Sequence, residues 1–304
     1  MSIFNQKVIK YEMKPLSSLE KVFPDETPVY RMECQMLSGL WGETVSFQVA
    51  YTGDFVMRER LDVRVVSELA EHVHVRTVEM VPVGRATNGI VDDNYLKTTS
   101  GLYPDLLKDL KDGKVIVYSR QWRSLWVDVD ITNEIPAGEY EIELQLIKEG
   151  EVVCSAKQKV TVIGTELPKL DIMHTEWMHA DCLADYYHVE VFSEEHWKLL
   201  ENYFQEYVKR DCNMMLTPLF TSPLDTAIGL ERTTCQLIDV EVKDGEYVFG
   251  FEKLKRWIDL CKKCGIEYFE MSHLFSQWGA KYAPKVVATV NGKKEKIFGW
   301  HTPA

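Results

Sequence analysis

The sequence lacks any long apolar run, and it has fewer basic than acidic residues. Nowhere do about 18 apolar residues stand together, and the first residues contain no apolar core behind a basic stretch. These absences predict a cytoplasmic protein without a secretion signal. Lys and Arg number 35 against 47 Asp and Glu, so the formal net charge is −12. Such a chain repels phosphate backbones and anionic lipid, so we expect neither nucleic acid nor a membrane as partner.

Cysteine is too sparse and scattered to form a disulfide scaffold. The seven cysteines are an odd number, which fits a reducing compartment. Cys261 and Cys264 make the one CxxC motif, and both lie on or near the apolar face of a helix expected at about 251–264. Packing is favoured over a redox or zinc site, because zinc requires further ligands. We expect no metal and no cofactor.

Residues 1–166 show the period-two alternation of β-strands. Apolar and polar residues alternate at 45–49, 125–129 and 140–146, and a hairpin is expected around 148–151. Several short strands separated by turns predict an N-terminal β-sandwich. One helix is expected at 104–111, because its leucines share one side and a glycine follows.

The period changes after Pro168, where apolar strands begin to alternate with amphipathic helices. We expect strands at 170–173, 214–219 and 266–271, and a polar loop that ends at Ser193, the cap of a helix whose inner face carries Trp197, Leu200, Phe204 and Val208. A hairpin is expected around Asp244-Gly245, and the residues after the third strand are expected to form a loop.

This alternation predicts a parallel sheet with helices outside it, as in a β/α barrel. A closed barrel usually needs about 250 residues, and about 200 is near the lower limit. The fold class is therefore multidomain, β plus α/β: a sandwich over 1–166, then about three units of an incomplete (β/α)8 TIM-type barrel over 167–304. A smaller α/β sheet with a covered edge is the alternative.

Functional residues of β/α barrels lie at the carboxyl ends of the strands. Aromatic rings beside carboxylates and amides are typical of sugar sites, because a pyranose stacks its C–H face on an indole and offers hydroxyls around its rim. Trp177 and Trp278 are candidate platforms, and a structural role in loop packing is the alternative. The full set of candidate sugar-binding residues is His174, Glu176, Trp177, His179, Asp181, Thr217, Asp225, Arg232, Glu270, His273, Gln277 and Trp278.

Three other chemistries are less well supported. His174, Glu176 and His179 form His-x-Glu-x-x-His, which differs from the helical His-Glu-x-x-His zinc motif. Cys182 lacks an evident group that would activate a thiol nucleophile. Glu176 and Glu270 end different strands and are the fallback pair of carboxylates for glycoside cleavage.

Several motifs resemble glycoside hydrolase family 123 and its uncharacterised bacterial relatives. The resemblance covers essentially the whole chain, and the motifs after Pro168 are the more specific ones. The motifs are His174-Thr-Glu-Trp-Met-His-Ala-Asp-Cys-Leu-Ala-Asp-Tyr-Tyr187, Leu216-Thr-Pro-Leu-Phe220, Pro223-Leu-Asp-Thr226, Glu231-Arg-Thr-Thr234, Tyr268-Phe-Glu-Met-Ser-His-Leu-Phe275 and Gln277-Trp-Gly279, with Gly101-Leu-Tyr-Pro-Asp-Leu-Leu107 and Trp122-Arg-Ser-Leu-Trp126 in the sandwich.

The resemblance implies an exo-acting β-N-acetylgalactosaminidase or related hexosaminidase that acts on a terminal N-acetylhexosamine. It also implies a retaining mechanism in which the 2-acetamido oxygen of the sugar attacks the anomeric carbon, an Asp orients that amide, and the adjacent Glu is acid and then base. Asp25-Glu26 is the one Asp-Glu dipeptide here, and its flanking prolines predict a turn.

No residue therefore matches the family's catalytic pair. We expect the 304-residue chain to be the N-terminal part of a glycoside hydrolase, to be inactive alone, and to carry part of the sugar subsite, with the catalytic pair beyond it. The alternative is a non-catalytic carbohydrate-binding protein whose sandwich is the binding module.

Overall fold

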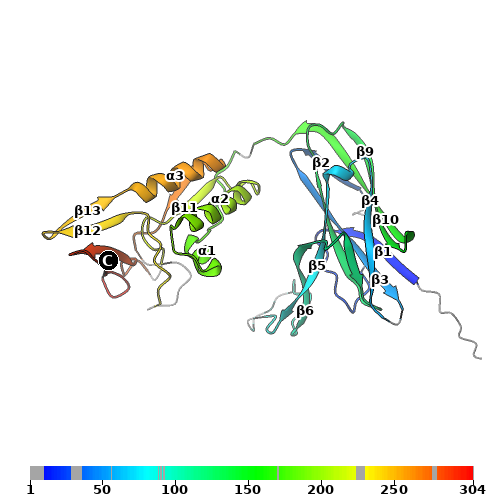
Figure 1. Cartoon of the computed structure of the whole chain (residues 1–304), viewed down its shortest axis with the longest axis horizontal. Helices are drawn as coiled ribbons and strands as arrows, with labels where there is room; N and C mark the ends of the chain where they lie inside the picture. Colours follow the sequence, from blue (N-terminus) through cyan, green and yellow to red (C-terminus); the bar gives the residue numbers. More distant parts are fainter. Residues whose placement is uncertain are drawn as a thin grey trace, which may run out of the picture. The chain divides into compact units, whose positions relative to one another are not determined.

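The computed structural model describes residues 10–28, 36–55, 57–87, 89, 91, 93–169, 171–223, 230–275 and 279–303. The chain divides into two compact units, Met1–Pro168 and Lys169–Ala304. Strands dominate the described residues, and helices are few (Figure 1). No helix among these residues combines the length and the apolar content needed to cross a bilayer.

The first unit contains two five-stranded sheets. One is antiparallel throughout, whereas the other contains one parallel pair, β2 with β10. In spatial order the first sheet is β1 (Lys10–Ser17), β3 (Thr44–Asp54), β8 (Arg123–Asp130), β5 (Val73–Val83) and β6 (Gly101–Asp109), and the second is β2 (Met36–Trp41), β10 (Glu151–Glu166), β9 (Gly138–Lys148), β4 (Glu59–Val66) and β7 (Lys114–Val117). A short 3-10 helix, η2 (Ala70–His72), precedes β5.

Both sheets contribute to one hydrophobic core. Phe47 and Leu125 come from the first sheet and Ile142 and Leu144 from the second, and each is at most 1% exposed. The alternation predicted for 45–49, 125–129 and 140–146 is thereby confirmed as strands β3, β8 and β9. The hairpin at 148–151 is confirmed too, with Glu149 and Gly150 both at positive φ, the geometry of a tight two-residue turn.

The helix predicted at 104–111 was wrong, because residues 104–109 belong to strand β6 and the chain leaves the strand after them. Leu106 and Leu107 pair with Glu79 and Val78 of β5. The register shifts directly after Pro104, at Asp105, and Pro104 has no N–H to give to a ladder. Leu106 is 57% exposed, so the leucines do not form the buried face that their spacing predicted.

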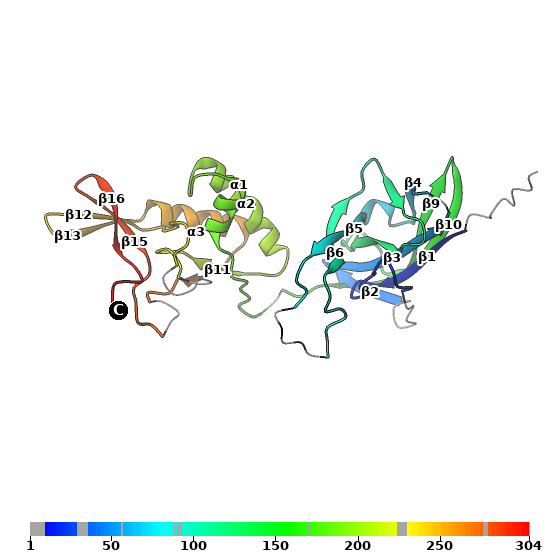
Figure 2. The same ribbon diagram turned by 90° about the horizontal axis from the view of Figure 1, so that it is seen from below.

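The described residues of the second unit form two small sheets and three helices. Figure 2 shows these elements from below. β11 (Met214–Thr217) and β14 (Tyr268–Met271) form a parallel pair. The helices α1 (Ala180–Tyr187), α2 (Glu194–Val208) and α3 (Glu252–Cys264) share a core with them. The second sheet has the order β13 (Glu246–Gly250), β12 (Asp239–Lys243), β15 (Val286–Val290) and β16 (Lys293–Phe298).

Several predictions for the second unit are confirmed. α2 follows Ser193 and buries Trp197, Leu200 and Phe204 on its inner face. The hairpin around Asp244-Gly245 is the β12–β13 pair. α3 ends at Gly265, whose φ of 104° is left-handed and suits a residue without a side chain.

Three other expectations for this unit were wrong. Of the strand expected at 170–173, residue 170 lies outside the described residues and residues 171–173 form no strand. The Asn213 side chain instead binds the Ile172 carbonyl and the His174 amide that follows this segment, at 2.8 Å each. α1 replaces part of the expected loop and buries Leu183 and Ala184. Residues 286–298, in the segment expected to be a loop, form the β15–β16 hairpin, and the four charged, exposed residues 293–296 of β16 gave no alternating apolar signal.

The hydroxyl of Ser193 caps α2 by accepting a hydrogen bond from the His196 amide at 3.2 Å. We expect Ser193→Ala to lower the free energy of unfolding by about 1 kcal/mol, because that amide loses its acceptor. Ser193→Asp should lower the free energy of unfolding by only about 0.3 kcal/mol, since Asp is also a favourable cap. Urea unfolding of the full chain compares the two variants, and equal losses in both would contradict a capping role.

Candidate functional site

The candidate site lies at the carboxyl ends of β11 and β14. The register pairs Leu216 with Glu270 and Thr217 with Met271, and the Ser272 amide donates to the Thr217 carbonyl at 2.9 Å. Carboxyl ends of parallel strands meet at one edge, so the residues that follow both strands are neighbours. Thr217 itself is fully buried and donates its hydroxyl to the Met215 carbonyl at 3.1 Å. It therefore supports the end of β11 and is not accessible to a ligand.

Three predicted residues come together at this edge: Trp177, Glu270 and His273. The indole Nε1 of Trp177 donates to Oε2 of Glu270 at 2.9 Å, and the Trp177 and His273 rings meet edge to face with centroids 5.8 Å apart. Phe269 packs into the core with the helices, so strand alternation directs its neighbour Glu270 to the opposite face of the sheet. Trp177 is 48% exposed. An accessible indole beside a half-buried carboxylate can serve as a sugar platform with a hydroxyl acceptor.

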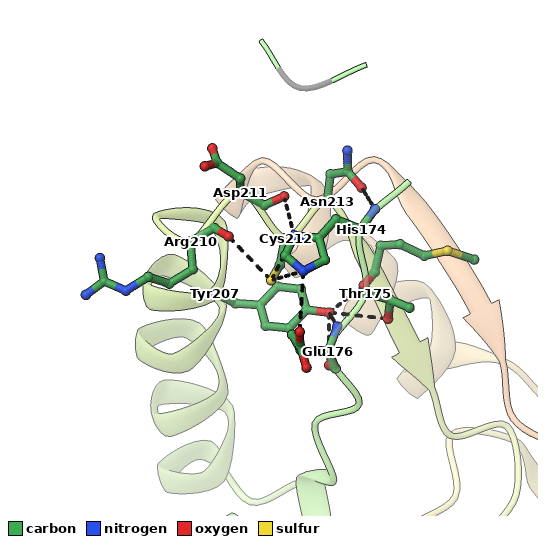
Figure 3. Close-up of polar contacts among 9 residues, drawn as sticks. His174, Thr175, Glu176, Tyr207, Arg210, Asp211, Cys212 and Asn213 are labelled. Atoms are coloured by element: carbon green, nitrogen blue, oxygen red, sulfur yellow. Dashed lines mark hydrogen bonds and ion pairs between the residues drawn. The ribbon is translucent and has the colours of Figure 1, made fainter. Parts of the chain in front are cut away.

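A second cluster fixes the segment that leads into Trp177 (Figure 3). The Tyr207 hydroxyl, on α2, accepts the Glu176 amide at 2.8 Å and lies 2.6 Å from the Met214 carbonyl, its closest acceptor. Burial is the main cause that raises the pKa of Tyr207, so the hydroxyl stays protonated and can donate. Tyr207 and Asn213 thus hold residues 172–176 beside the start of β11.

Sequence analysis missed both Tyr207 and Asn213. Tyr207 follows Phe204 by three residues on the inner face of α2, and this spacing was the available signal. Nothing in the sequence marks Asn213 as the partner of His174, because the two lie 39 residues apart.

The acidic and thiol groups of this second cluster have local partners. His174 Nε2 lies 3.4 Å from Glu176 Oε1, and His174 Nδ1 lies 3.8 Å from the Cys212 sulfur. Burial, and then the charges of Glu176 and Asp211, raise the pKa of Cys212, so it is a thiol at neutral pH. In the part of the chain that the structure describes, no three His, Cys, Asp or Glu side chains are arranged to hold a metal ion.

Asp181 and Arg232 form an internal ion pair. Arg232 Nε donates to Asp181 Oδ2 at 2.8 Å, Nη2 reaches Oδ1 at 3.3 Å, and the two side chains are only 11% and 8% exposed. Burial opposes the charge on Arg232, but its bonds to Asp181 outweigh burial and raise its pKa. Arg232 Nη2 also lies 2.9 Å from the Cys182 sulfur, a basic neighbour that sequence analysis did not identify. As sugar contacts, Asp181 and Arg232 stay predictions.

His179 stands at the N-cap of α1, half-buried. Behind it, the buried His196 accepts the Phe192 amide at Nδ1 and contacts the Ala180 carbonyl through Nε2, both at 2.9 Å, so its Nε2 carries the proton. Desolvation lowers the pKa of His196, which keeps the ring neutral. The predicted residues Asp225, Gln277 and Trp278 lie outside the described residues.

The CxxC cysteines pack against the helices. Cys261 is fully buried and Cys264 is half-buried, and burial raises the pKa of both thiols. The six cysteines that the structure describes are all unpaired by disulfides.

A cavity of about 490 Å³ lies elsewhere in the second unit, lined by Phe192, Gln236, Lys253 and Lys294 among others. It touches neither Trp177 nor Glu270. The exposed platform and carboxylate are therefore the better candidate for sugar chemistry, because no tryptophan is among the described residues that line the cavity.

Comparison with known proteins finds a family match for the part of the chain that contains Trp177, Glu270 and His273. Residues 177–303 match the family model described as glycoside hydrolase 123, catalytic domain. The chain resembles the structure of a family 123 glycoside hydrolase from Clostridium perfringens, described for glycolipid glycan hydrolysis, with a TM-score of 0.67 and 13% identity over 95% of this chain and 52% of that chain. Our chain thus spans about half the length of that protein.

Other comparisons add little. A β-glucosidase from Listeria innocua aligns with a TM-score of 0.24 at 10% identity, over 53% of this chain and 17% of that one, which is too weak to support a conclusion. No curated protein sequence matches the chain. The family match confirms the resemblance found in the sequence motifs, and the likeness to the Clostridium structure concerns the fold.

Proposed function

We propose, from the match of residues 177–303 to the glycoside hydrolase 123 catalytic-domain model, that this chain is the N-terminal part of an exo-acting β-N-acetylgalactosaminidase or related hexosaminidase. Its first unit is proposed to be the β-sandwich, residues 1–166, and its second the opening units of a TIM-type barrel, residues 167–304. The observation that carries the proposal is the contact of Trp177 with Glu270 and His273 at the carboxyl ends of the strands.

In this proposal the Trp177 cluster is one wall of a subsite for a terminal N-acetylhexosamine. The indole face would stack on the apolar face of the sugar ring, and Glu270 would accept a hydrogen bond from a sugar hydroxyl as well as the one from the Trp177 N–H. The hydrogen bond fixes the carboxylate beside the ring, so platform and acceptor keep a defined spacing. Sugar binding therefore loses less entropy than it would with two independent side chains.

The proposed reaction proceeds with retention and with assistance from the substrate. The 2-acetamido oxygen attacks the anomeric carbon, an Asp orients the amide, and a neighbouring Glu gives its proton to the leaving oxygen and then takes one from water. Glu270 contacts Trp177 and Glu176 contacts His174, and neither glutamate has an Asp beside it in the sequence. We place the catalytic pair outside residues 1–304, and the comparison in which this chain covers 52% of a family 123 protein supports that placement.

Incubation of the chain with an aryl β-N-acetylgalactosaminide tests this assignment. We expect release of the aryl group no faster than in buffer, because the acid and the amide-orienting carboxylate are not supplied. Glu270→Gln should leave that rate unchanged. Turnover above background that disappears in Glu270→Gln would instead make Glu270 catalytic and overturn the placement of the pair outside residues 1–304.

The alternative is a non-catalytic carbohydrate-binding protein whose β-sandwich binds the sugar. Calorimetric titration of the full chain with N-acetylgalactosamine distinguishes the two. A subsite at Trp177 predicts that Trp177→Ala weakens binding about tenfold, the equivalent of about 1.4 kcal/mol of lost stacking. Trp300, also partly exposed at 42%, provides the matched control, and Trp300→Ala should bind normally. Affinity that survives Trp177→Ala would favour the sandwich.

A further inference from the structure

The first unit has a cavity with a chemistry opposite to that of the whole chain. Its volume is about 520 Å³, and it lies between edge strands of the two sheets, β6 on one side and β7 on the other. Six basic residues line it: Arg58, Arg60, Lys108, Lys111, Lys114 and Arg123. The acidic lining is limited to Glu59, Glu79 and Asp109. A basic cavity in a chain of net charge −12 selects for negative groups by its local field.

The fold explains why the cavity stays open. The chain leaves β6 at Asp109 and enters β7 at Lys114, so residues 110–113 connect one sheet to the other, and Lys111 of this connection lines the cavity. Because the two edge strands belong to different sheets, no ladder joins them along the rest of the gap. Tyr51, Val78 and Val115 form a buried floor.

Part of the basic lining has no internal counter-ion. Arg60 pairs with Asp112 at 2.9 Å and Lys114 with Asp62 at 3.1 Å. Among the described residues, by contrast, the ammonium groups of Lys108 and Lys111 and the guanidinium of Arg58 form no ion pair. The carboxylate of Glu59 is already neutralised by Lys148 at 2.9 Å. Glu79 and Asp109 form no ion pair among the described residues either, so two unpaired carboxylates face the unpaired cations of Arg58, Lys108, Lys111 and Arg123, and the net uncompensated charge of the lining is positive.

Arg123 adds a buried donor to this surface. Its guanidinium lies 5.0 Å from the ring centroid of Tyr118, and Nη2 donates to Gln121 Oε1 at 3.1 Å. Its Nη1 is buried and has no hydrogen-bond partner in the described part of the chain. A buried N–H without an acceptor costs about 1–3 kcal/mol, and a bound oxyanion would remove that penalty.

We propose that this cavity binds an acidic sugar, one whose ring carries a carboxylate or a sulfate ester. The anionic group would contact Arg123, Lys108 and Lys111, whose N–H groups give charge-assisted hydrogen bonds to oxyanions. The sugar ring would lie against Tyr118 and the floor, and the volume accommodates one ring with its substituents. This site lies within the first unit and is independent of the subsite proposed at Trp177.

Calorimetric titration of the full chain tests the proposal with four probes: N-acetylneuraminic acid, N-acetylgalactosamine 6-sulfate, neutral N-acetylgalactosamine and sodium sulfate. We expect the double variant Lys108→Gln/Lys111→Gln to weaken the binding of both acidic sugars at least about fivefold. Raising the salt concentration from about 50 to about 300 mM should also weaken the binding of both acidic sugars to the wild-type chain. The matched control is Lys157→Gln/Lys159→Gln, two exposed lysines on β10 that do not line the cavity.

The outcomes separate this proposal from the other site. Acidic sugars that bind no better to the wild type than to the double variant would overturn it, and so would sulfate ion that binds as tightly as the acidic sugars. Acidic-sugar binding that is lost in Trp177→Ala but kept in the double variant would place that ligand in the second unit and also overturn it. Arg123→Gln provides an independent variant, and circular dichroism establishes that each variant is folded.

Discussion

Replacing Arg232 with Met is expected to lower the free energy of unfolding of the second unit by about 3–5 kcal/mol. The substitution removes the cation that faces Asp181 and leaves a carboxylate that is only 8% exposed without its partner. It also removes the donor to the Cys182 sulfur. Because the pair connects α1 with residue 232, the loss should be felt at α1 and in the loop before β12.

The urea dependence of hydrogen–deuterium exchange in α1 and α2 of the full chain measures this effect on the second unit. The double variant Asp181→Leu/Arg232→Met should recover much of the stability, since no buried charge is left unpaired. Lys263→Met is the control, because Lys263 pairs with Glu201 while 66% exposed and should cost at most about 1 kcal/mol. Equal losses in Arg232→Met and Lys263→Met would show that the Asp181–Arg232 pair stabilises the unit no more than an exposed ion pair does.

Trp257→Ala is expected to lower the free energy of unfolding by about 3–5 kcal/mol. Trp257 is fully buried at the centre of the second unit, where its ring meets Phe204 edge to face at 5.1 Å and Trp197 at 6.5 Å. Truncation removes these contacts and leaves a cavity between α2 and α3, which a tightly packed core fills only in part.

Trp257→Phe separates ring packing from the indole N–H. Trp257 Nε1 is buried and has no hydrogen-bond partner among the described residues, so Phe removes an unsatisfied donor while it keeps most of the aromatic contact. We expect Phe to cost clearly less than Ala in the same exchange measurement. Trp300→Ala, at a site 42% exposed, should cost less than about 1 kcal/mol. A loss in Trp257→Ala no larger than in Trp300→Ala would contradict the central position of Trp257.

The strands and helices with one buried face could be predicted from the sequence. β3, β8 and β9 alternate, and α2 carries its apolar residues at helical spacing, so local pattern and tertiary burial agree. The pattern failed at β6 and β16, where the apolar or charged residues do not face a core. There the structure is decided by pairing with β5 and β15, and pairing partners have no local signal.

The candidate site could be predicted in part. The rule for strand ends selected Trp177, Glu270 and His273, and the structure brings those three together. The same rule selected Asp181 and Arg232, which satisfy each other instead of facing solvent. Two charged residues 51 positions apart give no sign in the sequence that they will pair, so the buried ion pair was beyond prediction.

The parallel pairing of β2 with β10 constrains the order in which the first unit can assemble during synthesis. Met36 to Leu40 pair with Lys159 to Ile163, so a strand made early receives its neighbour only when the last strand of the unit leaves the ribosome. Until then β2 has no neighbouring strand in its sheet, and its backbone N–H and C=O groups are unpaired. Gly39 of β2, where an added Cβ would clash with Val45 and Ile131, then has no strand beside it. A ribosome stalled before β10 would therefore hold a first unit without its second sheet complete, the state in which a nascent chain most needs a chaperone.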